Sequence, residues 1–277
     1  MNDKYDNYSV LMSVYYKEKA EYLESAMNSV WNQTIPTNDF VLVCDGFLTP
    51  ELDAVIETMS IAHSELNVIR IRENGGLGNA LNIGIKHCKN ELVARMDSDD
   101  YSLADRFEKQ LTYMKNNPTV NVLGGQIVEF DLTLKNKLAA RIVPTTMNDI
   151  VKVMPYRNAM NHVTVMYKKT AVVNAGNYMD CPFFEDYYLW CRMLKMGYKF
   201  SNIDSVLVNV RTGNDMYKRR GGKEYNKAIV EFQKKILELG FTNMVQCYIN
   251  VAIRLIVANM PNFFRGLLYR TKLRTNA

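Results

Sequence analysis

Three aspartates stand within four positions of one another in the segment ELVARMDSDDYSLADRFEKQ, residues 91–110. Asp97, Asp99 and Asp100 follow an apolar run that is typical of a buried strand. Carboxylates at this spacing repel one another unless a positive group offsets their charge. Because carboxylate oxygens suit hard divalent cations, the triplet predicts a site for Mg²⁺ or Mn²⁺. A cation held by one or two carboxylates keeps free coordination positions, which diphosphate oxygens can fill.

Two other interpretations of the triplet remain open at this point. A calcium loop of the EF-hand type that begins at Asp97 would have its twelfth ligand at Glu108, but its sixth position is Ser102, where glycine is needed. A strand, not a helix, also precedes this loop. In the other interpretation, Asp99 or Asp100 caps a helix that begins near residue 103. Capping explains one aspartate, not three.

The elements that must position these aspartates alternate between apolar runs and helical patterns, which predicts an α/β fold with a mostly parallel sheet. Strands are predicted at residues 9–16, 40–46, 67–72, 91–97, 120–131, 162–169 and 200–211. Helices are predicted at residues 20–34, 49–62, 76–88, 103–117 and 183–197, with a short one after Pro144. We expect one catalytic domain over residues 1–221 and a helical, basic C-terminal region over residues 222–277.

Ligands of an open parallel sheet bind beyond the carboxyl ends of its strands. Asp45 and Asp97 both stand at such ends in this prediction. Asp97 and Asp99 are two positions apart, so their side chains point the same way in an extended chain. The nearby stretch NGGLGNALN, residues 74–82, departs from GxGxxG spacing. It is typical either of a turn that enters a helix or of backbone lying close to a nucleoside and its phosphates.

Two further segments carry titratable side chains with more than one interpretation. Glu185 and Asp186 in FFEDYYLW either complement the dipole of a helix N-terminus or include a general base. A carboxylate beside aromatic walls is partly desolvated and can accept a proton from an attacking hydroxyl. His162 in NHVTVMY is typical of a hydrogen-bonded structural residue, or it contacts an acceptor or a phosphate.

A basic loop, RTGNDMYKRRGG, spans residues 211–222. Its cations are Arg211, Lys218, Arg219 and Arg220. The loop is either simply solvated or a lid that clamps a leaving diphosphate, whose developing negative charge the cations would stabilise.

The composition excludes several classes of protein. Of 277 residues, 48% are hydrophobic and 23% are charged, which is ordinary for a globular chain. The sequence has no apolar stretch long enough for a spanning helix and no apolar signal core behind MNDKYD, so neither membrane insertion nor secretion is predicted. The five scattered cysteines form no CxxC pair and indicate a reduced, cytoplasmic protein. The three histidines form no metal-binding pattern.

The net charge of +5 is unevenly distributed. No acidic residue follows Glu238, whereas five cations do: Arg254, Arg265, Arg270, Lys272 and Arg274. The segments INVAIRLIVANM and NFFRGLLYR read as amphipathic helices, so this region either lies on an anionic membrane surface or packs on the domain. Nucleic acid is not a predicted partner, because no stacking aromatics interleave the cations.

Taken together, these motifs resemble the family 2 glycosyltransferases of the GT-A fold, in the branch that builds bacterial O-antigen, capsule and exopolysaccharide. The resemblance covers residues 9–222 through SVYYKEKAEYLESAMNSVWNQT, VLVCDG, NGGLGNALN, ARMDSDD, FFEDYYLW and KRRGG, in the family's order. It implies a nucleotide-diphosphate sugar donor, with a UDP-hexose favoured, a divalent metal, and direct displacement with inversion. It further implies an undecaprenyl-diphosphate-linked sugar as acceptor, and a cytoplasmic enzyme at the inner face of the membrane.

The resemblance also implies a role for individual residues. Asp97-Ser98-Asp99 matches the DXD metal motif, with Asp99 as the direct ligand and Asp97 holding the metal or the ribose. Asp186 would be the catalytic base, supported by Glu185. The remaining donor contacts would be Ser13, Tyr15, Asp45, Asn74, Gly75, Ser98, Asp100, Arg211, Lys218, Arg219 and Arg220.

Two departures from the family pattern affect this assignment. Gly46 stands where many members have a second aspartate, which puts ribose contacts there in doubt. No histidine follows His162, so Arg and Lys must supply the phosphate contacts. The alternatives are a sugar nucleotidyltransferase or an inactive nucleotide-sugar-binding subunit. The first would need a glycine-rich phosphate loop where YYKEKAEYLESA stands, and the intact aspartates argue against the second.

Overall fold

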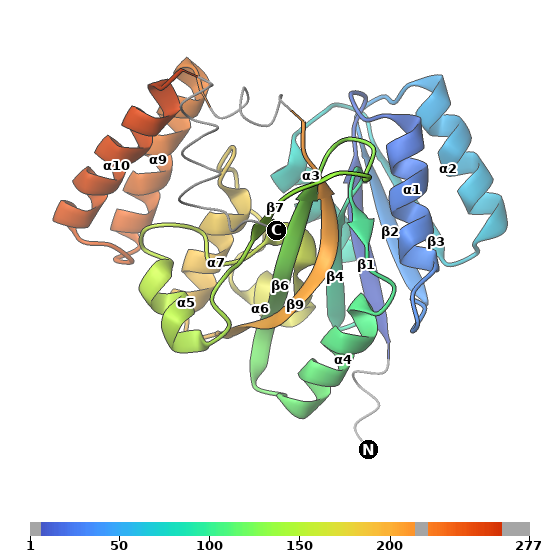
Figure 1. The fold of residues 1–277 in the computed structure, drawn as a ribbon, viewed down its shortest axis with the longest axis horizontal. Coiled ribbons are helices and arrows are strands. Elements are labelled where there is room, and N and C mark those ends of the chain that lie inside the picture. The colour runs from blue at the N-terminus through green and yellow to red at the C-terminus, as the bar shows by residue number, and fades with distance from the viewer. Residues whose placement is uncertain (1–6, 214–220, 262–277) are drawn as a thin grey trace.

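The strands form one mixed sheet of nine strands within the part of the chain that the structure describes. The computed structural model describes residues 7–213 and 221–261. The strand order is β3-β2-β1-β4-β8-β6-β9-β5, and β7 pairs with β6 outside this path (Figure 1). The strands are β1 (Tyr8–Val14), β2 (Asp39–Asp45), β3 (Leu66–Ile71), β4 (Leu92–Asp97), β5 (Tyr101–Ser102), β6 (Val120–Phe130), β7 (Lys137–Arg141), β8 (Met166–Lys168) and β9 (Lys199–Arg211).

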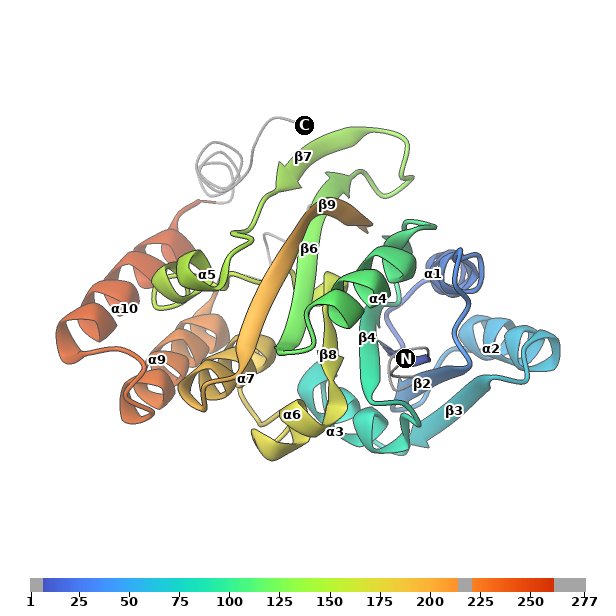
Figure 2. The same cartoon turned by 90° about the horizontal axis from the view of Figure 1, so that it is seen from below.

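Helices cover both faces of the sheet, and Figure 2 shows α4 on one side with α3 and α6 on the other. The helices are α1 (Ala20–Trp31), α2 (Pro50–Ala62), α3 (Leu77–His87), α4 (Arg106–Asn116), α5 (Met147–Val153), α6 (Lys169–Asn174), α7 (Glu185–Lys195), α9 (Lys223–Glu238) and α10 (Met244–Asn259). The start of α2 follows its sequence signal, since the Thr49 side chain accepts a hydrogen bond from the Leu52 backbone N–H and Pro50 is the first helical residue.

The parallel half of the sheet, β3-β2-β1-β4, confirms the predicted α/β pattern. Strand β2 is buried along its whole length, as parallel strands covered on both faces are. Its alternate side chains sort into two cores. Val41 and Val43 pack in the core that includes α3, and Leu42 packs in the core that includes α1 and α2. In the other half, β8 runs antiparallel between β4 and β6.

The predicted strand over residues 162–169 is wrong in its first half. His162–Thr164 form a 3₁₀ turn, and only Met166–Lys168 are a strand. The Thr164 hydroxyl donates to the Asn161 carbonyl at 2.8 Å and accepts from the Gly125 backbone N–H at 3.0 Å. These side-chain bonds to backbone compete with a strand ladder. The short strands β5 and β7 were not predicted.

The predicted helical C-terminal region is confirmed by α9 and α10. Phe232 and Ile236 of α9 join the same core cluster as Trp190 of α7. No helix in the described ranges is long and apolar enough to cross a bilayer. The predicted amphipathic segment NFFRGLLYR, at residues 262–270, lies outside the described residues. The boundary between residues 221 and 222 stays a prediction.

Candidate active site

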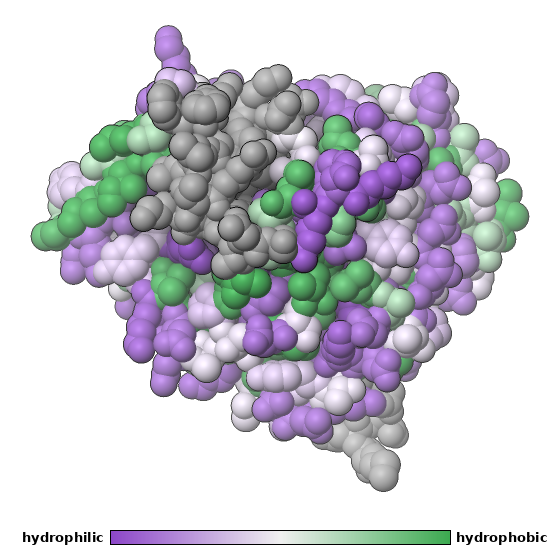
Figure 3. All heavy atoms as spheres, viewed as in Figure 1, coloured by the Kyte–Doolittle hydropathy of each residue, from purple (hydrophilic) through white to green (hydrophobic). Residues whose placement is uncertain are grey.

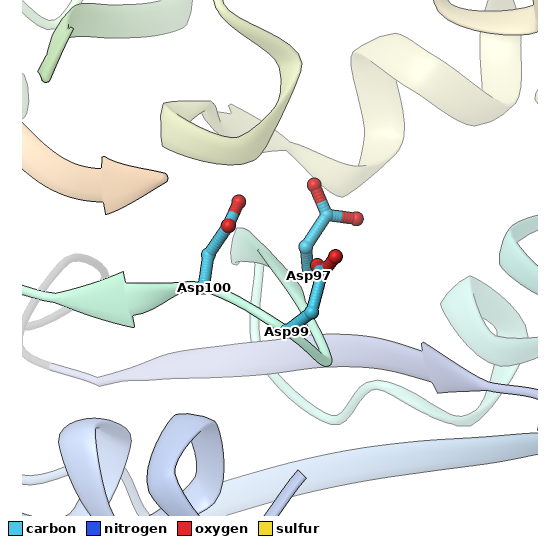
Figure 4. Close-up of side chains that lie close together, drawn as sticks. All are labelled: Asp97, Asp99 and Asp100. Carbon is cyan, nitrogen blue, oxygen red and sulfur yellow. The ribbon is translucent and has the colours of Figure 1, made fainter. Parts of the chain in front are cut away.

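The three aspartates converge at the carboxyl end of β4. Asp97 ends the strand, Asp99 lies in the following turn and Asp100 precedes β5 (Figure 4). One carboxylate oxygen from each residue lies within 4.8 Å of the other two. Three oxygen donors at this separation fit a divalent cation. Neither Asp99 nor Asp100 caps α4, which begins at Arg106 with Asp105 in the N-cap position, so the capping interpretation is wrong.

The cluster concentrates negative charge in a partly buried place. Burial, followed by the charges of Asp97 and Glu18, raises the pKa of Asp99 to about 7. Burial and the charges of Asp99 and Asp97 likewise raise the pKa of Asp100 well above its usual value. The Ser98 hydroxyl donates a hydrogen bond to Glu18 at 3.1 Å. A bound cation would reverse the pKa shifts because it favours the ionised carboxylates.

A buried cation that was not predicted, Arg95, lies beside this cluster. Its side chain is 2% exposed and forms an ion pair with Asp97, whose side chain is 34% exposed. Burial lowers the pKa of Arg95, but Asp97, with smaller contributions from Tyr178 and Asp100, more than offsets burial and leaves the pKa raised, so the guanidinium stays charged. The only signal in the sequence is an arginine inside the apolar strand pattern LVARMD.

Arg211 holds the other end of the aspartate turn. Its backbone N–H donates to Asp100 Oδ1 at 2.9 Å, and its guanidinium donates to the Asp99 carbonyl and to Ser25 Oγ, the latter at 3.0 Å. The guanidinium also lies over the Tyr22 ring, 4.6 Å from its centroid. Arg211 is therefore brought to the cluster, while its contact with a diphosphate stays a prediction. Lys218, Arg219 and Arg220 lie outside the described residues.

The carboxyl ends of β1, β2 and β4 meet at one edge of the sheet, as parallel pairing requires. Ser13 pairs in register with Asp97 on one side and with Val43 on the other. Tyr15 follows β1 at this edge, and Asp45 ends β2. The sheet thus brings together the predicted nucleotide contacts from three strands.

Asp45 organises the glycine loop. Its two carboxylate oxygens accept hydrogen bonds from the backbone N–H groups of Gly75, at 2.8 Å, and Gly76, at 2.9 Å. The Asn74 side-chain amide donates to the Asp45 carbonyl at 3.0 Å. Gly46 has a φ of +88°, and a Cβ there would lie 2.9 Å from the Asn74 backbone nitrogen. The departure from a second aspartate at Gly46 thus has a steric reason, and nucleotide contact by Asp45 itself stays a prediction.

The acidic pair starts helix α7. Burial and the charge of Asp186 raise the pKa of Glu185 to about 7. Burial also raises the pKa of Asp186, although its carboxylate accepts hydrogen bonds from the Asn158 side-chain amide and the Tyr187 backbone N–H, each at 2.7 Å. No pattern in the sequence marks Asn158, because it lies in a loop 28 positions before Asp186.

A cleft of about 770 Å³ lies between the start of α3 and the segment before α7. Glu185 lines this cleft. Gly78 of α3 approaches this residue so closely that a Cβ added to Gly78 would lie 3.2 Å from Glu185 Cβ. The lining residues are Gly75, Gly76, Leu77, Gly78, Asn79, Asn82, Tyr178, Met179, Asp180, Cys181, Pro182, Phe183 and Glu185. A carboxylate with a raised pKa that faces such a cleft is suited to proton transfer.

His162 is not among the residues that line this cleft. Its Nε2 lies 2.9 Å from the hydroxyl of Tyr178, which does line it. Burial, followed by the charge of Arg95, lowers the pKa of His162 well below its usual value and keeps the ring neutral. These contacts fit the hydrogen-bonded structural interpretation, and contact with an acceptor stays a prediction.

The chain matches the sequence model of a known family over most of its sheet. The model described as "Glycosyl transferase family 2" matches residues 9–178. The amylovoran biosynthesis glycosyltransferase AmsE of Erwinia amylovora is 37% identical over 262 residues, which are 95% of this chain and 97% of that protein.

A second relative and a solved structure extend the comparison. The Escherichia coli protein described as UDP-Gal:alpha-D-GlcNAc-diphosphoundecaprenol beta-1,3-galactosyltransferase is 32% identical over 274 residues, 99% of each chain. The crystal structure of S. aureus TarS 1-349 in complex with UDP-GlcNAc aligns with a TM-score of 0.65 and 17% identity, covering 96% of this chain and 76% of that one. This likeness confirms the predicted GT-A fold.

Proposed function

Because the chain belongs to glycosyl transferase family 2, we propose that it transfers a hexose from a UDP-sugar to a sugar hydroxyl on a lipid-diphosphate-linked acceptor. The product would enter the synthesis of a bacterial surface polysaccharide; the relative AmsE is described as a glycosyltransferase of amylovoran biosynthesis. The donor and acceptor classes rest on the Escherichia coli relative, whose description names UDP-Gal and a diphosphoundecaprenol-linked sugar. The observation that carries the proposal is the convergence of three carboxylate oxygens within 4.8 Å of one another, together with a cleft lined by Glu185, the residue next to Asp186.

The donor would bind at the shared edge of β1, β2 and β4. Ser13, Tyr15 and the loop held by Asp45 would contact the nucleoside, with Asn74 and Gly75 in that loop. Asp99 and Asp97 would hold Mg²⁺ or Mn²⁺, which supplies Lewis-acid stabilisation of the departing diphosphate when bound. Arg211, Lys218, Arg219 and Arg220 would add positive charge toward the diphosphate, and Asp100 would fix the turn against Arg211.

Asp186 would act as the general base. It would take the proton of the acceptor hydroxyl as that oxygen attacks the anomeric carbon from the face opposite the diphosphate, which inverts the configuration. Each of its oxygens accepts one hydrogen bond and keeps a further lone pair for the incoming proton. Glu185, which shares the same helix start, would support this role by holding the acceptor in the cleft. The raised pKa of Asp186 makes it a better proton acceptor than an ordinary aspartate.

We also propose that the protein works as a peripheral protein on the inner face of the cell membrane. A face of α10 is apolar and at least half exposed, and Figure 3 shows hydrophobic side chains gathered along this helix. Its members are Met244, Val245, Tyr248, Ile249, Ile253 and Ile256. The sequence beyond Glu238 carries five cations and no acid, which complements anionic lipids. An acceptor on a polyprenyl chain would itself reside in that membrane.

The test of the proposed function is donor binding and turnover. We would mix the purified chain with UDP-, GDP- and dTDP-sugars, with Mn²⁺ or with chelator, and follow nucleotide release and thermal stability. We expect one nucleotide class to stabilise the protein only when metal is present, and Asp99→Ala to abolish this effect. Asp105→Ala is the matched control, because Asp105 pairs with Lys109 outside the cluster. If neither nucleotide release nor thermal stability depended on metal with any donor, the proposal would be contradicted.

A further inference from the structure

Two consecutive phenylalanines in front of the acidic pair have opposite environments. Phe184 is 5% exposed and stacks on Phe232, with ring centroids 4.6 Å apart and planes 12° from parallel. Phe183 is 48% exposed and lines the cleft. The ring of Phe184 is thus part of the core, whereas the ring of Phe183 leaves an apolar surface open to whatever occupies the cleft.

The backbone of Phe183 is held in the left-handed region, with a φ of +67°. A bulky side chain rarely adopts this conformation, which glycine and asparagine adopt far more easily. Strained backbone of this kind persists where the surrounding structure fixes it, and it gathers at ligand-binding sites. Here the positive φ lets Phe184 enter the core while the preceding ring turns toward the cleft.

The ring of Phe183 has a fixed support and a polar wall across from it. Tyr225 of α9 meets it edge to face, with centroids 5.2 Å apart and planes at 88°. The opposite wall consists of the glycine loop and the start of α3, including the side chains of Asn79 and Asn82. Glu185 lies at the same cleft. The cleft therefore offers one exposed aromatic face together with amide and carboxylate groups.

This combination matches the chemistry of a sugar ring. A pyranose has a face of C–H groups that packs on an aromatic ring, and a rim of hydroxyls that needs hydrogen-bond partners. We propose that Phe183 is the platform on which the acceptor sugar stacks, an inference that rests on the proposed function. The acceptor is the sugar assigned here because Phe183 stands three residues before Asp186 and lies on the wall of the cleft opposite Gly75, the one predicted nucleotide contact among the lining residues.

The experiment replaces Phe183 and separates acceptor binding from donor binding. The probes are UDP-sugars and a panel of sugars on short-chain lipid diphosphates, including α-GlcNAc-diphosphate. For Phe183→Ala and Phe183→Gly we expect the acceptor KM to rise about 3- to 10-fold, because the acceptor sugar loses one aromatic stacking contact. Metal-dependent hydrolysis of the donor and its KM should stay within about twofold of wild type. Phe183→Tyr should retain the wild-type acceptor KM.

Thermal stability distinguishes the platform from a structural role. Phe183→Gly removes the backbone strain along with the ring, so its Tm should equal or exceed that of wild type. Met196→Ala is the control, since Met196 is a half-exposed apolar residue at the far end of α7. An unchanged acceptor KM in both the Ala and Gly variants, or a rise in the donor KM instead, would overturn the platform. If the wild-type chain transfers sugar to no member of the panel, the proposed function itself fails, and the platform fails with it.

Discussion

The side-chain amide of Asn158 donates a hydrogen bond to Oδ2 of Asp186 at a distance of 2.7 Å. A hydrogen bond to an ionised carboxylate favours the charged form and lowers its pKa, whereas burial raises the pKa. Burial dominates at Asp186, whose pKa is raised, and Asn158 limits the size of that rise. Together with the Tyr187 backbone N–H and the charge of Arg95, Asn158 therefore limits how far burial raises the pKa of the side chain to which we assign proton transfer.

We predict that Asn158→Ala moves the acidic limb of the kcat–pH profile toward higher pH, by up to about one unit. Without the hydrogen bond the pKa of Asp186 rises further, so the carboxylate is already protonated at a higher pH and the rate falls earlier as the pH decreases. The measurement is the transfer rate between pH 5 and 9. Asn117→Ala is the control, because the Asn117 side-chain amide donates to the Tyr113 carbonyl of α4 and not to Asp186. Superimposable profiles for wild type and Asn158→Ala would remove Asp186 from the role of base.

A second prediction concerns stability and metal. The pKa of Asp99 is about 7 in the folded protein, above its usual 3.8. The folded state thus binds this proton more tightly than the unfolded state, and the contribution of Asp99 to stability falls as the pH rises from about 4 to about 7. We expect Asp99→Asn to match the Tm of wild type at pH 4 and to exceed it at pH 8.

Mn²⁺ should reverse this difference. At pH 8 a bound cation offsets the repulsion among the carboxylates in wild type, so Mn²⁺ should raise the Tm of wild type and leave Asp99→Asn nearly unchanged. Each kcal/mol of stabilisation corresponds to about 2–4 °C for a chain of this size. Thermal denaturation at both pH values, with Mn²⁺ or with chelator, checks the prediction. An equal response of the two proteins to Mn²⁺ would exclude Asp99 as a ligand.

The sequence predicts the parallel half of the sheet well because each element there carries its own signal. Strands such as β2 are apolar along their whole length, and α2 begins at a Thr-Pro pair that caps a helix by itself. The carboxyl ends of parallel strands share one edge, so the convergence of Asp45 and Asp97 also followed from the order of elements. The predicted strand at 162–169 failed because its apolar pattern was overruled by the side-chain bonds of Thr164.

The parts of the site that were not predicted depend on contacts between distant segments. Asn158 reaches Asp186 across 28 positions of sequence, and no local pattern marks it. Arg95 is recognisable as a site residue only when burial and its ion pair with Asp97 are known. Asp45 was predicted to contact the nucleotide. Its hydrogen bonds to the glycine loop, 30 residues further along the chain, could not be inferred from spacing. Local sequence patterns thus predicted the helices and strands, whereas the residues that contact each site side chain could be identified only from the folded structure.

A third prediction tests whether the glycine loop must lie against β2. Gly46→Ala forces a Cβ onto a φ of +88° and within 2.9 Å of the Asn74 backbone nitrogen, which cannot move as a side chain can. We expect a loss of more than about 1–2 kcal/mol of stability and a weaker thermal shift with UDP. Gly197→Ala is the matched control, since its φ is +82° but nothing lies within 4 Å of the added Cβ. Gly197→Ala should lose a similar amount of stability through backbone strain, but it should keep the wild-type affinity for UDP. Equal affinity for UDP in both variants would mean that the loop does not contact the nucleotide.

The last prediction concerns the apolar face of α10, which we assign to the membrane. Ile249 and Ile253 are 50% and 56% exposed, so Asp at these positions should leave the fold intact while removing apolar area from the contact with lipid. We expect the double variant Ile249→Asp, Ile253→Asp to bind vesicles of phosphatidylglycerol and phosphatidylethanolamine at least tenfold more weakly, because each side chain contributes about 1 kcal/mol and the new charges repel the anionic surface.

Cosedimentation with these vesicles at low and high salt measures this effect. Ile61→Asp is the control, because Ile61 is 83% exposed on α2, away from α10, and should not alter vesicle binding. A second copy of the chain is the competing occupant of the α10 face. If the double variant binds vesicles as wild type does but shifts a concentration-dependent dimer to monomer in sedimentation velocity, the face is a protein interface and not a membrane contact. Retained salt sensitivity in the double variant would further show that the basic residues after Glu238 act on the lipid surface separately from the apolar face.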